Sequence, residues 1–223
     1  MTIIQATLWT LAFLAVLLLV TALNVIIWRR WFGDLAPWLN LLSLGTMGVL
    51  FFSYMAEITA ITPNFAFSGF NDLLLALIAP CVMFALLDRG LDPFLERCFP
   101  HSERTYQQSL ATLKQSPWAS LIHVGFLGPI VEELLMRGFV LNGLLDQHSL
   151  FISLMISSAL FALLHFNMVQ TVSALIAGLI LGLLYIYTDS VVPCIIAHCL
   201  YNLLSYIRST PKTDLKTSRK DAS

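Results

Sequence analysis

The chain has 223 residues, of which 58% are hydrophobic and only 11% charged, with a net charge of -1. A soluble domain carries about 45–50% apolar and about 25% charged residues, and a soluble fold of this size has too little interior for so much apolar surface. These values exclude a soluble enzyme, a disordered protein and a nucleic-acid-binding protein. They predict an all-α, polytopic membrane protein whose main partner is lipid.

Residues 1–87 contain three apolar runs, and about 20 apolar residues are needed to cross a bilayer. The first, residues 3–28, has no charged residue and ends at Trp28-Arg29-Arg30-Trp31, a mixture of charge and aromatic rings typical of a membrane boundary. The second extends from 37 to 60, and the third, from about 72 to 87, is the shortest. We expect three N-terminal transmembrane helices.

Residues 88–116 differ in composition, because they hold eight of the 25 charged residues. Asp92-Pro93 is typical of the N-cap and first residue of a helix. Tyr106, Leu110 and Leu113 repeat at spacings of four and three, which forms one apolar face. We predict an amphipathic segment in the cytoplasmic membrane interface; a solvated loop is the alternative.

The C-terminal part of the chain contains a second group of apolar runs, followed by a polar tail over 208–223 that we predict to be disordered. The resulting bundle has about seven transmembrane helices, with residues 117–207 as its C-terminal helical core. The four predicted spans in this core are residues 117–145, 149–166, 169–187 and 191–207.

Seven crossings divide the basic residues very unequally between the two sides. Eleven of the twelve Lys and Arg residues fall on one side and none on the other, while Arg137 lies within a span. Cytoplasmic loops carry the excess of Lys and Arg. We therefore predict that the N-terminus faces out and the C-terminus faces the cytoplasm.

Three charged residues, Glu132, Glu133 and Arg137, lie inside one predicted span. Each costs about 2.5–3.5 kcal/mol near the bilayer centre, so their presence needs an explanation. Glu133 and Arg137 are four residues apart and can pair on one helix face. Glu132 points about 100° away from Glu133 and is left without that partner. A structural ion pair therefore explains two of the three charges.

Further polar residues occur in two later spans: His165 in one, and His198 with Asn202 four residues on in the other. A lone intramembrane His is more often a helix–helix hydrogen bond than a catalytic group. Two His, one Asn and an unpaired Glu within three spans together predict a functional site.

These residues form three ordered motifs: Glu132-Glu133-Leu-Leu-Met-Arg137, Phe161-Ala-Leu-Leu-His165 and His198-Cys-Leu-Tyr-Asn202. In this order, over about residues 117–207, they resemble the CAAX prenyl endopeptidase and bacteriocin-processing (CPBP, or Abi) family of intramembrane proteases. All motif positions are intact. The resemblance implies an endopeptidase that cuts a membrane-associated peptide or protein. Because such a hydrolase needs water, we expect the motif side chains to surround a cavity open to the cytoplasm.

The same resemblance implies a role for each motif residue. Glu132 would be the general base that activates water, and His165 would orient that water or share its proton. His198 and Asn202 would stabilise the oxyanion of the tetrahedral intermediate. The supporting residues would be Glu133, Arg137 and Phe161.

The use of a metal is open at this point, and no cofactor is assigned. Glu132, His165 and His198 also make a ligand set for a catalytic zinc ion with one open position. A thiol mechanism is the third possibility, since Cys194, His198 and Asn202 share one helix face. Side chains on a single helix seldom reach the geometry that such a set requires, so we expect Cys194→Ala to retain activity.

Two other functions fit intramembrane Glu and His residues. A proton-coupled transporter is one, although the two halves of the chain show no internal repeat of the kind many transporters have. A non-catalytic immunity or scaffold protein is the other. The small size of the chain resembles the bacterial members of the family, which suggests the plasma (inner) membrane.

Overall fold

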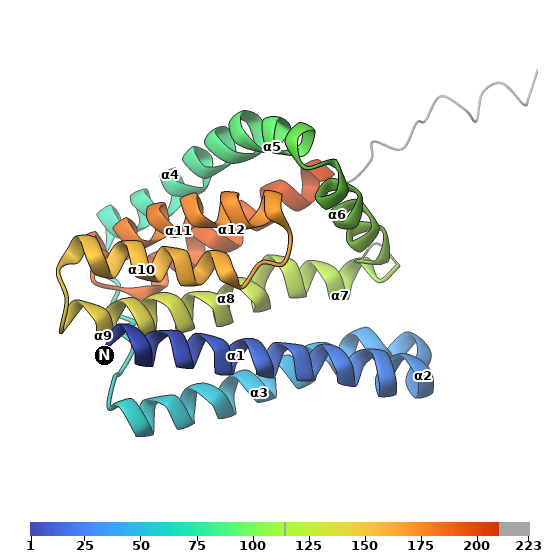
Figure 1. Ribbon diagram of the computed structural model, residues 1–223, viewed down its shortest axis with the longest axis horizontal. Helices are drawn as coiled ribbons and strands as arrows, with labels where there is room; N and C mark the ends of the chain where they lie inside the picture. Colours follow the sequence, from blue (N-terminus) through green and yellow to red (C-terminus); the bar gives the residue numbers. More distant parts are fainter. Residues whose placement is uncertain (114, 210–223) are drawn as a thin grey trace, which may run out of the picture.

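The computed structural model describes residues 1–113 and 115–209, and every regular element in them is helical (Figure 1). The prediction of an all-α, polytopic bundle is therefore confirmed. Five helical runs are long and apolar enough to cross a membrane, and α10 (Leu150–Leu163) is a shorter apolar helix. The five runs are Ile3–Thr59, Phe70–Cys98, Pro117–Leu145, Met168–Thr188 and Val191–Arg208.

The first run folds back on itself, so that α1 (Ile3–Leu23) and α3 (Ala36–Thr59) lie antiparallel and in contact (Figure 1). Gly33 lies at the reversal with a φ of 47°, a backbone conformation that favours glycine. The predicted count of seven crossings requires α1 and α3 each to cross, and α10 to cross with only 14 residues. That count stays a prediction.

The turn that closes this hairpin has three short elements: a π-helical turn at Asn24–Trp28, α2 (Arg29–Phe32) and a 3₁₀ turn at Gly33–Leu35. Aromatic rings connect α3 of this hairpin to the rest of the bundle. Phe52 of α3 stacks on Phe139 with ring centroids 5.8 Å apart and planes 8° from parallel. The hairpin is thus attached to the C-terminal core, while most of its apolar surface faces outward.

The third predicted span is longer than expected. α4 (Phe70–Leu86) continues through a π-helical turn at Leu87–Leu91 into α5 (Asp92–Cys98) without a break. The prediction that Asp92 caps a new helix is wrong: its backbone is helical, and its carboxylate accepts a hydrogen bond from Ser173 instead. α6 (Pro100–Leu113) follows, but the side chains of Tyr106, Leu110 and Leu113 lie outside the described residues.

The next run covers residues 117–145, as expected, but it is not a regular α-helix. α7 (Pro117–Ile122) and α8 (Gly128–Glu133) alternate with two π-helical segments, after which α9 (Asn142–Leu145) completes the run. The π-helical segments are His123–Leu127 and Leu134–Leu141. Such segments are rare and often occur at functional sites. Here the second one begins directly after Glu133.

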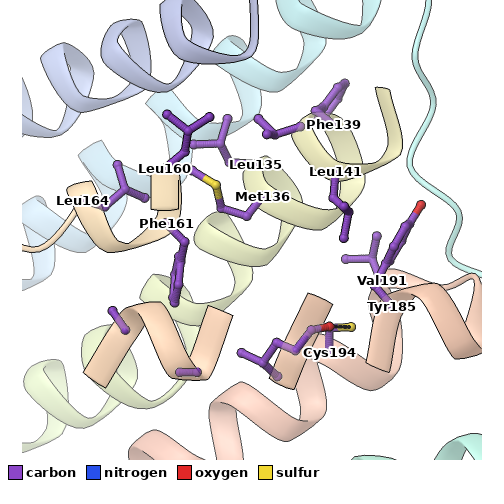
Figure 2. Packing of buried hydrophobic residues seen from close by; sticks show 14 of the residues in the cluster. Leu135, Met136, Phe139, Leu141, Leu160, Phe161, Leu164, Tyr185, Val191 and Cys194 are labelled. Atoms are coloured by element: carbon purple, nitrogen blue, oxygen red, sulfur yellow. Dashed lines mark hydrogen bonds between the residues drawn. The ribbon is translucent and has the colours of Figure 1, made fainter. Parts of the chain in front are cut away.

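The last three helices form the centre of the bundle: α10, α11 (Met168–Thr188) and α12 (Val191–Ser209). α12 packs against α4, α8 and α11, and α11 packs closely on α10. Figure 2 shows part of the apolar core that holds these helices against the 117–145 run. The predicted tail largely falls outside the described residues, since only Arg208 and Ser209 of 208–223 are described, and both are helical.

Candidate active site

Five of the motif residues, from three separate parts of the chain, line one cavity of about 510 Å³, whereas Glu133 and Arg137 are not part of its lining. α8 contributes Glu132, α10 contributes Phe161, the segment that follows α10 contributes His165, and α12 contributes His198 and Asn202. The structure therefore brings together residues that are up to 70 positions apart in sequence. Glu132 and His165, which belong to different segments, line the same space.

Glu133 forms the centre of a fully buried polar network. Its Oε1 atom accepts a hydrogen bond of 3.0 Å from Arg137 and lies 2.8 Å from Nδ1 of His198. Arg137 also donates to the carbonyl oxygen of Gly178 on α11, at 3.0 Å. Glu133 and Arg137 are 0% and 1% exposed. The pair is thus the expected ion pair, and it additionally ties α12 and α11 to the helix that carries Glu132.

The contact between Glu133 and His198 determines which nitrogen of the His198 ring is turned towards Glu132 and the cavity. With Nδ1–H donating to the Glu133 carboxylate, Nε2 is the nitrogen left to face Glu132. The distance between Nε2 and Oε2 of Glu132 is 3.8 Å, longer than a direct hydrogen bond. Glu132 is 24% exposed on its side chain, whereas Glu133 has no exposure. The two adjacent carboxylates therefore have different surroundings and can have different roles.

Phe161 contacts both histidines and Arg137. Its ring lies edge-on to His165 and to His198, with centroids 5.3 and 5.7 Å away, and the Arg137 guanidinium lies 4.9 Å from its centre. An aromatic ring in this position excludes water from the Glu133–Arg137 pair and limits the rotation of both imidazoles. Phe161 is thus a packing element of the site.

His165 and Asn202 are both held by backbone carbonyl groups. Nδ1 of His165 is 3.2 Å from the carbonyl oxygen of Phe161, one turn earlier, which leaves Nε2 to face the cavity. The side-chain amide of Asn202 donates to the carbonyl oxygen of Val124 at 2.9 Å. An amide nitrogen carries two hydrogens, so this bond uses only one of its donors.

The zinc alternative requires three ligands close to one point. Within residues 1–113 and 115–209, no three His, Cys, Asp or Glu side chains are grouped so that they could hold a metal ion. Glu132, His165 and His198 share the cavity without forming such a group, so their arrangement here does not fit a zinc site. We therefore derive no catalytic step through a metal.

Cys194, the residue of the thiol alternative, is not among the residues that line the cavity. It is fully buried where α11 and α12 meet (Figure 2), and its Sγ atom lies 3.4 Å from the carbonyl oxygen of Leu181. A single α-helix carries Cys194 and His198, but packing directs the thiol to the neighbouring helix.

Two features of the site go beyond the sequence analysis. The first is the bond between Glu133 and His198, since the motifs suggested only a scaffold role for Glu133. The second is the opposite wall of the cavity, to which Asp88, Asp92 and Glu96 contribute. Their spacing of four residues was a signal for a common helix face. Nothing in the sequence showed that this face meets α11 and α12.

Residues 114–204 match the sequence model of a protein family described as type II CAAX prenyl endopeptidase Rce1-like. The matched part covers fewer than half of the 223 residues and contains all three motifs. Neither the curated proteins nor the solved structures include a match to this chain. The match supports a CAAX-protease-like enzyme in general. The resemblance inferred from the motifs is thereby confirmed, and residues 114–204 of this multi-pass membrane protein form an Rce1-like region.

Proposed function

We propose that this protein is an intramembrane endopeptidase that hydrolyses a peptide bond in a membrane-associated peptide or protein. The observation that supports the proposal most strongly is the pairing of two adjacent carboxylates with one histidine. Glu133 holds His198 from the buried side, and Glu132 faces the same ring from the cavity. A structural ion pair would need only Glu133 and Arg137.

In the proposed reaction, Glu132 removes a proton from a water molecule in the cavity while the oxygen of that water attacks the scissile carbonyl carbon. The electron pair of the carbonyl π bond moves onto the carbonyl oxygen, which becomes the oxyanion, and it re-forms the C=O bond when the intermediate collapses. The protonated Glu132 then donates its proton to the leaving nitrogen as the C–N bond breaks, so that a carboxyl group and an amine are formed. His165, whose Nε2 faces the cavity, orients the water.

His198 and Asn202 stabilise the oxyanion in this proposal. The amide of Asn202 has one donor beyond its bond to Val124. Nε2 of His198 donates when the ring is doubly protonated, and in that form the Glu133 carboxylate is its ion-pair partner. Donors held in place before the reaction stabilise the transition state without further reorganisation, and each is typically worth about 10²–10³ in rate.

The test is cleavage of a panel of membrane peptides by the purified protein in detergent micelles. Glu132→Gln should abolish cleavage, because the amide cannot accept the proton of water. Glu57→Gln is the matched control, since Glu57 is exposed on α3, away from the cavity. Cleavage by Glu132→Gln at the wild-type rate would refute the role of Glu132 as the general base. The absence of cleavage by wild-type protein would instead favour a binding or transport function.

A chelator arm in the same assay separates the two chemistries left open by the sequence. Activity that survives chelation and is lost in Glu132→Gln identifies a metal-free glutamate peptidase. Activity lost on chelation and restored by zinc would instead require Glu132, His165 and His198 to rearrange into a ligand set.

A further inference from the structure

A second cavity, of about 330 Å³, lies between the turn of the N-terminal hairpin and the start of the 117–145 run. Residues between positions 24 and 41 line one side, and residues between 115 and 123 line the other. None of them also lines the candidate active site. We call this space the turn cavity. Its volume is within the range of about 300–1,000 Å³ that is typical of small-molecule sites.

The turn cavity is lined mainly by polar side chains that lack a partner in the protein. Asn24, Asn40 and His123 are partly buried, and Arg29 and Asp34 are exposed. Among the residues that the structure describes, none of these five side chains has a hydrogen bond or an ion pair with another. Polar groups that are partly removed from water gain free energy when a ligand supplies the missing partners. The cavity therefore offers several unused donors and acceptors to one ligand.

Arg29 and Asp34 give the turn cavity one positive and one negative charge, and across the described residues the two do not pair with each other. A guanidinium group binds a phosphate through two parallel hydrogen bonds. A carboxylate accepts hydrogen bonds from an ammonium group, and the amides of Asn24 and Asn40 can donate as well as accept. This lining matches a ligand that carries both a phosphate and an ammonium group better than it matches a simple anion.

Exposed tryptophans indicate that the turn cavity lies at the membrane boundary. Trp31 and Trp118 are each 72% exposed, and Trp38 is 47% exposed. They belong to α2, α7 and the start of α3, and α2 and α7 lie at the same end of the molecule (Figure 1). Tryptophan collects at the level of the lipid headgroups. Further along α3, Leu42 and Val49 are exposed, as expected where acyl chains cover a helix.

We propose that the turn cavity binds the phosphoethanolamine headgroup of a membrane phospholipid. Its phosphate contacts Arg29, its ammonium group contacts Asp34, and its acyl chains lie along the exposed apolar surface of α3. The bound lipid connects the hairpin turn to the helical run that carries Glu132, and so stabilises the attachment of the hairpin. This inference does not rest on the peptidase function, because it concerns other residues and is tested by stability instead of cleavage.

The first test measures thermal unfolding of the wild-type protein in detergent micelles that contain one added phospholipid. Phosphatidylethanolamine, phosphatidylcholine and phosphatidylglycerol with identical acyl chains are compared. Phosphatidylethanolamine at about 100 times its Kd should raise the melting temperature by about 5–10 °C. Phosphatidylcholine has no N–H donor and phosphatidylglycerol has no positive charge, so both should raise it less. Equal shifts with all three lipids, or no shift, would overturn the headgroup assignment.

A fourth arm uses water-soluble phosphoethanolamine, which has the same charged groups without acyl chains. It should give no comparable shift at the concentration at which the lipid acts. An equal shift would overturn the assignment to a membrane lipid, because the occupant would then be a free phosphate compound.

The second test compares Arg29→Gln with Arg30→Gln. Arg30 is the adjacent basic residue and is also exposed, but it does not line the cavity, and its guanidinium lies over the Trp31 ring. Arg29→Gln should need roughly tenfold more phosphatidylethanolamine to reach half of the stabilisation, whereas Arg30→Gln should keep the wild-type titration. Asp34→Asn should reduce the difference between phosphatidylethanolamine and phosphatidylcholine. Identical titrations of the two arginine variants would overturn the site, and the lipid arms with wild-type protein test it even if a variant fails to fold.

Discussion

The buried contact between Glu133 and His198 predicts that Glu133 acts on the reaction as well as on stability. Replacing Glu133 by Leu leaves the Arg137 guanidinium, which is 1% exposed, without its carboxylate. Breaking a buried ion pair in this way costs about 3–5 kcal/mol. For a chain of this length that corresponds to a melting temperature lower by about 6–20 °C. Thermal unfolding in detergent, followed by circular dichroism, measures the change.

Two double variants separate the structural from the positioning role of Glu133. Glu133→Leu/Arg137→Met and Glu133→Gln/Arg137→Met both remove the unpaired charge, so both should recover most of the stability. Only Gln keeps an oxygen that accepts the hydrogen bond from Nδ1 of His198. Such a bond is worth about 1.5–3 kcal/mol, so the Gln variant should cleave roughly 10- to 100-fold faster than the Leu variant. Equal rates for the two folded variants would refute the positioning role.

Three further predictions concern packing and the remaining motif residues. Gly178→Ala places a Cβ atom 3.1 Å from Cα of Ser158 and should cost about 1–3 kcal/mol in thermal unfolding, whereas Gly45→Ala, which meets no atom within 4 Å, should not destabilise the protein. Asn202→Ala should lower kcat about 10²–10³-fold with little change in KM, and the exposed control Asn71→Ala should leave both constants unchanged. An increase in KM with kcat unchanged would instead assign Asn202 to substrate binding. Cys194→Ala should retain wild-type cleavage, because the thiol points towards Leu181 and away from the cavity; inactivity of a correctly folded variant would support the thiol mechanism.

The sequence predicted the helical class and most helix positions because lipid imposes a simple rule. A spanning segment must be apolar and must satisfy its own backbone, so the run 117–145 and the helix 169–187 could be placed almost to the residue. The third span was predicted to end at about residue 87, whereas the helical run continues to Cys98. The charges of Asp88 and Asp92 suggested a break, but both side chains find hydrogen-bond donors on α11 and α12, so the helix continues.

The candidate site could be predicted in part. The three motifs named Glu132, His165, His198 and Asn202, and those four side chains do share a cavity in the structure. Spacing along one helix also gave the Glu133–Arg137 pair. Contacts between helices could not be obtained in this way, because one sequence carries no information on which faces meet. The hydrogen bond between His198 and Glu133 is one such contact between helices. The contacts of Asp92 with α11 and of Asp88 with α12 are two others.

The non-helical segment between α3 and α4 connects the two halves of the chain in a way that the family match does not reveal. Val191 donates to the carbonyl oxygen of Asn64 at 2.9 Å, and the Asn64 amide donates to the carbonyl oxygen of Asp189 in the turn between α11 and α12. At the opposite end of α12, Ser205 is bonded to Asp88. α12, most of which lies in the matched region, therefore depends near both of its ends on residues before position 114. A fragment cut at the family boundary would lose those partners, and a graft of the region into another scaffold would have to carry α4 and the 60–69 segment with it. The region that matches the family is thus smaller than the set of segments that these hydrogen bonds hold together.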